Sequence, residues 1–433
     1  MHPIDLAYAA AVRVGLALTS LAVPFSPKLR RGWAGRRETL PSLRKWAEAA
    51  RQPDRPLIWF HAPSVGEALM AQAIMAEVRT VLPCAQFIFT HFSPSAERAA
   101  ARVGADWFGY LPWDRARDID AALELARPSA VAFVRTEIWP VLVRRAQHRG
   151  ARVVLVNAVL AETSSRLRAP ARALLGHAYR ALDAVGAVTE HDAALLARLG
   201  VADGRVHITG DARFDQVWQH SRAINRERPL LRMFREGGPW LVAGSTWPPD
   251  EERLVRALIA ARAGGASWRT IIAPHEPSTA HLRQLERRVH AAGMRYALLP
   301  AEGVAALPEL IDIVIVDRVG VLADLYAVAA VAYVGGGFGN TGLHSVAEPA
   351  SLGVPVVFGP RHGNAKEAGR LAAAGGGFIV RNGEELQETL RRLRRDVPAR
   401  VQAGAAARDF VSSHTGGADR SAALLVAGLP RCD

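Results

Sequence analysis

The sequence predicts an α/β protein with two Rossmann-like, doubly wound domains that face each other across a cleft, preceded by a membrane-associated helix. Three observations lead to this prediction. Short apolar runs of strand length alternate with helix-length segments. The alternation stops once, near the middle of the 433 residues, and then restarts. Residues 1–45 differ from both halves, because an apolar stretch there leads directly into a basic one.

The N-terminal segment has the composition of a membrane contact. Leu6 to Phe25 is almost wholly apolar, and a spanning helix needs about 20 such residues. Arg13 lies near its middle, so a helix lying in the bilayer interface fits as well as one that crosses it. Between Lys28 and Lys45, seven basic residues accompany one acid, which favours the cytoplasmic side of a membrane containing anionic lipid. The alternative is a buried first helix followed by a solvated basic loop.

Residues 46–220 are expected to form the first domain. Continuous rather than alternating apolar runs are typical of a parallel sheet covered on both faces. The segments between them, rich in Ala, Leu and Arg, complete the βα units. The expected strands are 57–62, 87–92, 130–136, 152–158, 183–189 and 206–210.

Residues 221–239 are expected to be a linker, because they are rich in arginine and contain no strand-like run. Residues 240–433 then repeat the pattern as a second domain that ends in helices. Its expected strands are 240–246, 270–275, 313–317, 330–337, 355–360 and 377–380. Ligands of doubly wound sheets bind outside the carboxyl ends of the strands, so functional residues are expected there.

Two carboxylates follow strands of the first domain. Glu67 comes after the first expected strand, and Glu137 ends the third. A carboxylate in this position would project into the cleft, where it could accept a proton from a substrate hydroxyl. Ser64 and Glu67 also have the spacing of a capping box, and Pro140 would begin a helix just after Glu137. Helix capping therefore stays open as the alternative for both acids.

Glycine-containing turns follow two strands of the second domain. One contains Ser245 and Thr246 and leads to a helix start; the other contains Gly335, Gly336 and Gly337. Turns of this kind expose backbone N–H groups that bind phosphate. The GxGxxG pattern with its acidic partner fails here, which argues against a dinucleotide cofactor.

Glu348 is expected on a short helix before the strand at 355–360. Its carboxylate could accept hydrogen bonds from a ribose diol, and His344, four residues earlier, would share its face. A capped surface helix with a satisfied histidine is the alternative. The sequence contains neither HExxH nor CxxC, so no metal site is expected.

With these residues assembled, the chain resembles the 3-deoxy-D-manno-octulosonic acid (Kdo) transferases of lipopolysaccharide synthesis, which are glycosyltransferases of the B-type fold. The similarity extends over nearly the whole chain. The segments that carry it are HAPSVGE (61–67), RTEIWP (135–140), NAVLAETSSR (157–166), ITGDARFD (208–215), GSTWPPDEE (244–252) and AEPASLGVPVVFGP (347–360).

The resemblance implies inverting transfer of Kdo from CMP-Kdo to a lipid A precursor of the lipid IVA type, at the cytoplasmic face of the inner membrane. Glu67 matches the general base and Glu137 the second carboxylate of the acceptor half. The implied partners are CMP-Kdo, the lipid A precursor and anionic lipid of the inner membrane, without nucleic acid, metal or other cofactor. The implied acceptor-binding residues are Ser64, Gly66 and Arg135. The implied donor-binding residues are Ser245, Thr246, His275, Gly335, Gly336, Gly337, His344, Glu348 and Asn364.

The donor half departs from the family pattern. Pro274 to Ser278 replaces a run that usually contains an arginine, so His275 could contact phosphate while the role of the arginine is left open. GGGFGNTGLHS replaces the usual glycine-rich runs, and Asn364 is followed by Ala365 where an aromatic residue is common. These changes bear on how CMP is held and resemble a divergent branch.

Two other functions stay open at this point. One is a different B-type glycosyltransferase that uses a UDP-sugar on a lipid-linked acceptor. The other is a non-catalytic basic protein that binds membranes or nucleic acid, as the net charge of +13 allows. That second alternative offers no reason for acids at Glu67, Glu137 and Glu348. Half of the residues are hydrophobic and 22% are charged, which excludes a chain disordered throughout.

Overall fold

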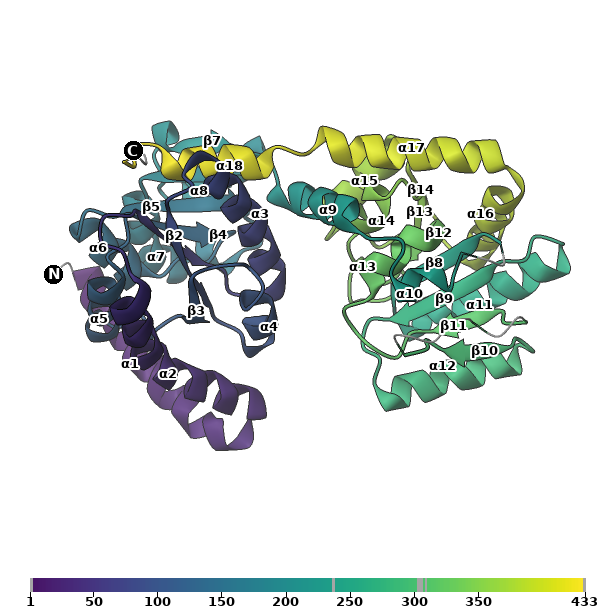
Figure 1. Cartoon of the computed structure of the whole chain (residues 1–433), viewed down its shortest axis with the longest axis horizontal. Helices are drawn as coiled ribbons and strands as arrows, with labels where there is room; N and C mark the ends of the chain where they lie inside the picture. The colour runs from purple at the N-terminus through teal and green to yellow at the C-terminus, as the bar shows by residue number, and fades with distance from the viewer. Residues whose placement is uncertain (1–2, 236–237, 302–306, 308–309, 431–433) are drawn as a thin grey trace. The chain divides into compact units, whose positions relative to one another are not determined.

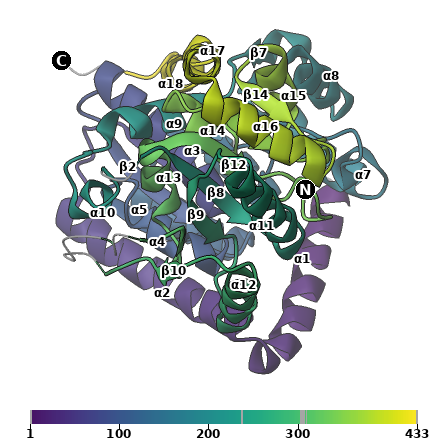
Figure 2. The same ribbon diagram turned by 90° about the vertical axis from the view of Figure 1, so that its right-hand side faces the viewer.

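The computed structural model describes residues 3–235, 238–301, 307 and 310–430. The chain forms two compact units, Met1–Gln216 with Thr415–Asp433, and Val217–His414. Each unit contains a parallel seven-stranded sheet, and Figures 1 and 2 show helices packed around the strands of each unit. The two doubly wound domains of the prediction are therefore confirmed.

The first sheet has the strand order β3-β2-β1-β4-β5-β6-β7. Successive residues of a strand face opposite sides, so Leu57 and Trp59 belong to one apolar core and Ile58 and Phe60 to the other. The strands are β1 (Leu57–His61), β2 (Gln86–His91), β3 (Trp107–Tyr110), β4 (Ala130–Val134), β5 (Arg152–Ala158), β6 (Ala184–Ala187) and β7 (Val206–Ile208). The α-helices that follow these strands along the chain are α3 (Val65–Val81), α4 (Glu97–Ala100), α5 (Ala116–Ala126), α6 (Pro140–His148), α7 (Ala171–Ala181), α8 (Glu190–Arg198) and α9 (Ala212–Ala223). A short 3-10 turn, η2 (Pro94–Ala96), precedes α4.

The second sheet has the order β10-β11-β9-β8-β12-β13-β14. Its strands are β8 (Trp240–Thr246), β9 (Arg269–Pro274), β10 (Tyr296–Leu298), β11 (Ile313–Ile315), β12 (Ala329–Val334), β13 (Val356–Phe358) and β14 (Gly377–Ile379). The helices are α10 (Pro229–Arg232), α11 (Pro248–Ala263), α12 (Thr279–Ala291), α13 (Leu322–Leu325), α14 (Ala347–Ser351), α15 (Lys366–Ala373), α16 (Gly383–Arg395) and α17 (Val397–Ser413). Strands β3 and β10 are not among those expected from the sequence.

The last helix, α18 (Gly417–Val426), departs from the expected second domain of residues 240–433. It packs against α3 and belongs to the first unit. The physical reason is its apolar face: Ala418, Ala422 and Leu425 are buried in the same core cluster as α3. The chain therefore returns to its first unit at the C-terminus.

The N-terminal segment forms α1 (Pro3–Ala22), the 3-10 turn η1 (Val23–Phe25) and α2 (Pro27–Ala50), drawn in purple in Figures 1 and 2. Within the described residues, Pro3–Phe25 is the one stretch of helix long and apolar enough to cross a membrane, and none of it is buried. Its N-terminal half is nevertheless attached to the first unit. The Tyr8 hydroxyl donates a hydrogen bond to Asp114 (2.9 Å), and Asp5 pairs with Arg144.

Candidate functional site

Both sheets place several of the expected site residues where the strand order reverses, while His275 follows β9 and Asn364 follows β13. In the first sheet β1 and β4 are hydrogen-bonded neighbours, although β2 and β3 lie between them in sequence. In the second sheet β8 and β12 are neighbours in the same way. Loops leave such a pair of strands in opposite directions and open a crevice at the carboxyl ends. Glu67 follows β1 and Glu137 follows β4; Ser245 and Thr246 are the last two residues of β8, and Gly335 follows β12.

Glu67 lies in the first turn of α3, and its carboxylate does not cap the helix. Ser64 is the N-cap residue, but no backbone N–H donates to its hydroxyl. That hydroxyl donates instead to the carboxylate of Glu67. The capping box that the spacing allows is therefore not formed. Gly66 is exposed, and a Cβ built on it would meet nothing within 4 Å, so packing does not demand glycine there.

Arg135 directly follows β4, and its side chain approaches Glu67, which follows β1. Its Nε lies 4.0 Å from Oε1 of Glu67, and both side chains are partly exposed, at 30% and 19%. Arg135 has a positive φ of 79°, which is costly for a residue with a side chain. Asn157 at the end of β5 and Ser245 at the end of β8 have φ values of 53° and 52°. Strain of this kind is typical of functional sites, and three of the four described non-glycine residues with a positive φ lie at strand ends; the fourth, Arg127, follows α5.

Asn157 and Asp211, which we did not predict as site residues, hold together the end of β5 and the loop after β7 in the first unit. The Asn157 Oδ1 accepts a hydrogen bond from the N–H of Ala212 (2.8 Å), and its Nδ2 donates to Asp211 (3.4 Å). Burial acts to raise the pKa of Asp211, but the charge and hydrogen bonds of Arg213 outweigh it and hold that pKa below its usual value. Both residues lie within the segments that carry the family resemblance, which was the available signal.

Glu137 lies in the half-buried loop after β4, and it does not cap α6 either. The buried N–H groups of Val141 and Leu142, in the first turn of α6, donate to Asp114, each at 2.9 Å. Burial raises the pKa of Asp114 to about 6, although these bonds oppose the shift. Neither Glu67 nor Glu137 therefore caps a helix.

Glu348 lies on α14, as expected, and has no structural partner for its carboxylate. Within the described part of the chain, no side chain or backbone group hydrogen-bonds to it. Burial raises its pKa to about 7. A largely buried carboxylate without a partner is rare in proteins, because burial disfavours its charge. It is available to accept hydrogen bonds from a ligand.

His344 does not share a helix face with Glu348, which corrects the sequence-based prediction. The helix begins only at Ala347, because the preceding residues form an irregular loop. His344 stacks instead on His275, with ring centroids 4.1 Å apart, and accepts a hydrogen bond from the indole N–H of Trp247 (3.2 Å). Burial and the charge of His275 lower its pKa to about 4. The structure thus joins both expected histidines and adds Trp247, which we did not predict.

Thr246, Asp250 and Glu251 are buried beneath the site residues of the second unit. Thr246 is fully buried, and its hydroxyl donates to Glu251 (2.9 Å), which also contacts His281 at 2.9 Å. Asp250 accepts hydrogen bonds from the N–H groups of Trp247 (3.0 Å) and Gly336 (2.9 Å). These contacts fix the loop after β8 against the loop after β12. Thr246 therefore supports the loop from within, while Ser245 beside it stays partly exposed.

The three glycines after β12 are required by close backbone approach. A Cβ at Gly335 would lie 2.3 Å from the Ser245 carbonyl oxygen, and one at Gly337 would lie 2.6 Å from the N of Gly359. Gly336 has a φ of 94°. Asn364 pins the same region, because its amide donates to the Leu343 carbonyl (2.8 Å) and accepts from the Leu343 N–H (2.9 Å).

The match to known sequences agrees with this geometry. Residues 32–216 match the family model described as 3-deoxy-D-manno-octulosonic-acid transferase. The chain is 30% identical over 315 residues to the 3-deoxy-D-manno-octulosonic acid transferase of Chlamydia muridarum, which covers 70% of each chain. The chain belongs to the Kdo transferase family. It is also 27% identical over 398 residues to the Bordetella pertussis enzyme of the same name, covering 87% of this chain and 89% of that one.

Solved structures show the B-type fold of this Kdo transferase family member. A UDP-N-acetylglucosamine 2-epimerase matches with a TM-score of 0.61 at 13% identity, covering 88% of this chain and 99% of that one. A glycosyltransferase from Rickettsia africae matches with a TM-score of 0.56 at 10% identity, covering 85% and 96%. Membership of the family makes the chain a Kdo-transferring glycosyltransferase of lipopolysaccharide synthesis, and the structural matches show that its two units have the B-type fold.

Proposed function

We propose that this enzyme transfers Kdo from CMP-Kdo to a lipid A precursor of the lipid IVA type, with inversion at the anomeric carbon and without a metal ion. The observation that carries the proposal is the state of Glu67. It lies at the reversal point of the first sheet, is partly exposed, caps no helix, and has Arg135 as its charged neighbour at 4.0 Å. Such a carboxylate is suited to accept a proton from a hydroxyl group.

The reaction is a single displacement. Glu67 takes the proton of the acceptor hydroxyl while that oxygen forms a bond to the anomeric carbon of Kdo. The bond from this carbon to the phosphate oxygen breaks, and CMP leaves with the electron pair. The transition state resembles an oxocarbenium ion, as in glycoside hydrolysis. Arg135 orients Glu67, and Glu137, Ser64 and Gly66 complete the acceptor side.

The second unit holds the nucleotide. Glu348 accepts hydrogen bonds from the ribose hydroxyls, which is supported by its unpartnered carboxylate. Ser245, the N–H group of Gly337 and the exposed His275 receive the phosphate, while the N–H groups of Gly335 and Gly336 donate to Gly244 and Asp250 and hold the turn in place. Thr246, His344 and Asn364 act indirectly by holding these loops. The leaving group carries a single phosphate, whose charge these donors can stabilise without a divalent ion.

The enzyme works at the cytoplasmic face of the inner membrane, in contact with anionic lipid. The exposed apolar side chains of α1 and the basic residues of α2 support this placement. A helix that is hydrogen-bonded to the unit through Tyr8 is better suited to lie at the surface than to cross the bilayer.

The test is incubation with CMP-Kdo and lipid IVA in the presence of EDTA, with product mass as the readout. The Glu67→Gln variant should lower turnover about 10²- to 10⁴-fold and leave CMP-Kdo affinity unchanged. Glu162→Gln, on an exposed side chain of the same unit, is the control. Normal turnover by Glu67→Gln would refute the base, and thermal stabilisation by UDP but not CMP would favour a UDP-sugar donor.

A further inference from the structure

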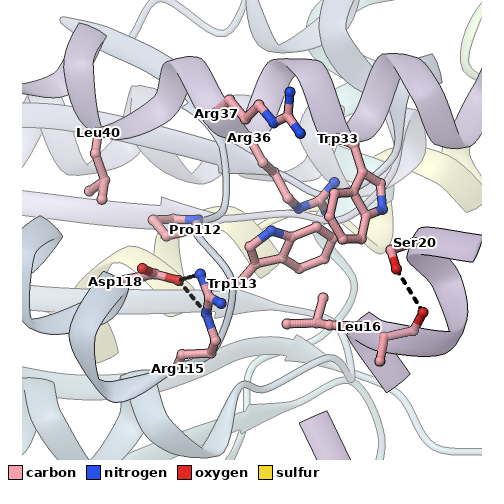
Figure 3. A pocket seen from close by; sticks show the side chains of 11 residues that line it. Leu16, Ser20, Trp33, Arg36, Arg37, Leu40, Pro112, Trp113, Arg115 and Asp118 are labelled. Carbon is pink, nitrogen blue, oxygen red and sulfur yellow. Dashed lines mark hydrogen bonds and ion pairs between the residues drawn. The ribbon is translucent and has the colours of Figure 1, made fainter. Parts of the chain in front are cut away.

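A groove between α1, α2 and the loops of the first sheet has no assigned role. One cavity of about 540 Å³ is lined mainly by apolar and aromatic side chains, which include Leu16, Trp33, Phe92, Trp113 and Trp139. A second cavity of about 530 Å³ shares Leu16, Trp33, Arg36 and Trp113 with it and is shown in Figure 3. Cavities of this size and composition are typical of ligand sites.

Helix α1 has two opposite apolar faces, and one of them lines the groove. Val12, Gly15, Leu16 and Thr19 line the cavity at the i, i+3, i+4, i+7 spacing of one helix face. The opposite face carries exposed Val14, Leu18 and Leu21, at 58%, 63% and 70% exposure. One apolar face of α1 therefore lines the groove, and the exposed apolar face opposite to it suits contact with a bilayer.

Arg36 places an unpaired cation in this apolar setting. It is 9% exposed and lines both cavities, where its guanidinium stacks on Phe92 (4.2 Å) and Trp113 (4.4 Å). Figure 3 shows it extending from α2 toward Trp113, beside Trp33. Two of its nitrogens donate to the carbonyls of Gly32 and Phe92, while its buried Nε has no hydrogen-bond partner. Asp114 and Asp118 also line the cavities and the charge of Glu137 acts on Arg36 from farther away, but in the described part of the chain no carboxylate forms an ion pair with it within 4.0 Å, so an anionic ligand would complete the site.

The groove lies near the acceptor half of the catalytic site, since the charge of Glu137 acts on Arg36. Trp139 lines it and lies two residues after Glu137. The indole N–H of Trp139 donates to Nε2 of His61 (3.1 Å), and His61 is the last residue of β1, from which the chain leads to Glu67. Trp139 therefore lies between the groove and the strand ends that precede both acids.

We propose that this groove binds one fatty acyl chain of the glycolipid acceptor and that Arg36 binds an anionic oxygen of the same acceptor. The proposal rests on the proposed function, since it names how that acceptor is recognised. Each methylene that moves from water into the groove tightens binding by about fourfold. The groove therefore selects an acylated acceptor over the bare sugar phosphate, and Arg36 selects a charged one.

The experiment fills the groove without disturbing the fold. Gly15 lines the groove, and a Cβ built on it would meet nothing within 4 Å. Gly15→Phe therefore adds a ring at the groove without a clash at the Cβ. Val14→Phe adds comparable bulk on the exposed face of the same helix and is the matched control. Transfer is measured with lipid IVA and with its fully deacylated, water-soluble form, and the thermal shift produced by lipid IVA is measured as a readout independent of catalysis.

We expect Gly15→Phe to raise the KM for lipid IVA at least tenfold and to abolish the thermal shift, while transfer to the deacylated acceptor stays as in the wild type. Val14→Phe should behave as the wild type in all three. Equal effects of both variants on lipid IVA would overturn the groove assignment. So would a Gly15→Phe defect limited to binding of phospholipid vesicles, because the groove would then hold membrane lipid.

Arg36 is tested by Arg36→Lys, which keeps the charge and removes the Nε–H. The wild-type preference for phosphorylated over dephosphorylated lipid IVA should fall at least tenfold, and an unchanged preference would overturn the role of Arg36. If the proposed function itself were wrong, the wild type would transfer Kdo to neither the acylated nor the deacylated acceptor. That result differs from every outcome that overturns the groove or the role of Arg36.

Discussion

Glu348 is the residue whose predicted role can be tested most sharply by pH. Burial raises its pKa from 4.5 to about 7, so the folded protein keeps it protonated at pH values where the unfolded chain has lost the proton. The folded state therefore gains stability from this group at low pH, and it loses that stability as the pH rises from 4.5 to about 7. The loss is about 3 kcal/mol, which is the free energy that corresponds to a rise of the pKa from 4.5 to about 7.

Glu348→Gln removes the charge and keeps the shape. At pH 5 the variant and the wild type should melt alike, because both carry a neutral side chain. At pH 8.5 the variant should be more stable by up to about 3 kcal/mol, which raises the melting temperature of a unit this size by roughly 6–12 °C. The assay is thermal unfolding of the full chain between these pH values, with the exposed Glu384→Gln as the control.

The same substitution should weaken the enzyme. A carboxylate that accepts hydrogen bonds from ribose contributes about 1.5–3 kcal/mol, so the donor KM should rise about 10- to 100-fold at pH 8. A variant that is more stable and binds its donor less well is the combination expected of a ligand-binding charge. A stability difference that is the same at pH 5 and pH 8.5 would refute the reasoning, and an unchanged donor KM would refute the ribose contact.

Three further predictions concern residues at or near the strand ends. Gly335→Ala should lower stability by about 1–3 kcal/mol in denaturant unfolding, because its Cβ would lie 2.3 Å from a carbonyl oxygen. Gly66→Ala should leave stability unchanged or slightly higher and raise only the acceptor KM; a donor effect would place Gly66 elsewhere in the mechanism. Thr246→Val should lower stability by about 1–3 kcal/mol by removing the hydrogen bond to buried Glu251, with CMP affinity unchanged in calorimetry. Loss of CMP affinity at unaltered stability would show that Thr246 contacts the nucleotide directly.

The architecture was predictable because a parallel sheet covered on both faces leaves a clear mark in the sequence. Runs such as 57–62 and 152–158 are buried along almost their whole length. Strand β3 escaped prediction because it is a short edge strand with an exposed Phe108 in its middle. Strand β10 lies at the edge of the second sheet and has no fully buried residue. Helix α18 could not be assigned to the first unit, since an apolar helix face does not indicate which sheet it covers.

The carboxylates show why the site could be predicted only in part. Asp114, Asp250 and Glu251 each receive two or more contacts from the protein, and they hold loops together. Glu348 receives none in the described part of the chain, and Glu67 receives one hydrogen bond and a distant arginine. In a sequence all five are acids close to strand ends or helix starts. The number of protein partners separates them, because a charge that the fold leaves unpartnered retains its capacity for a substrate.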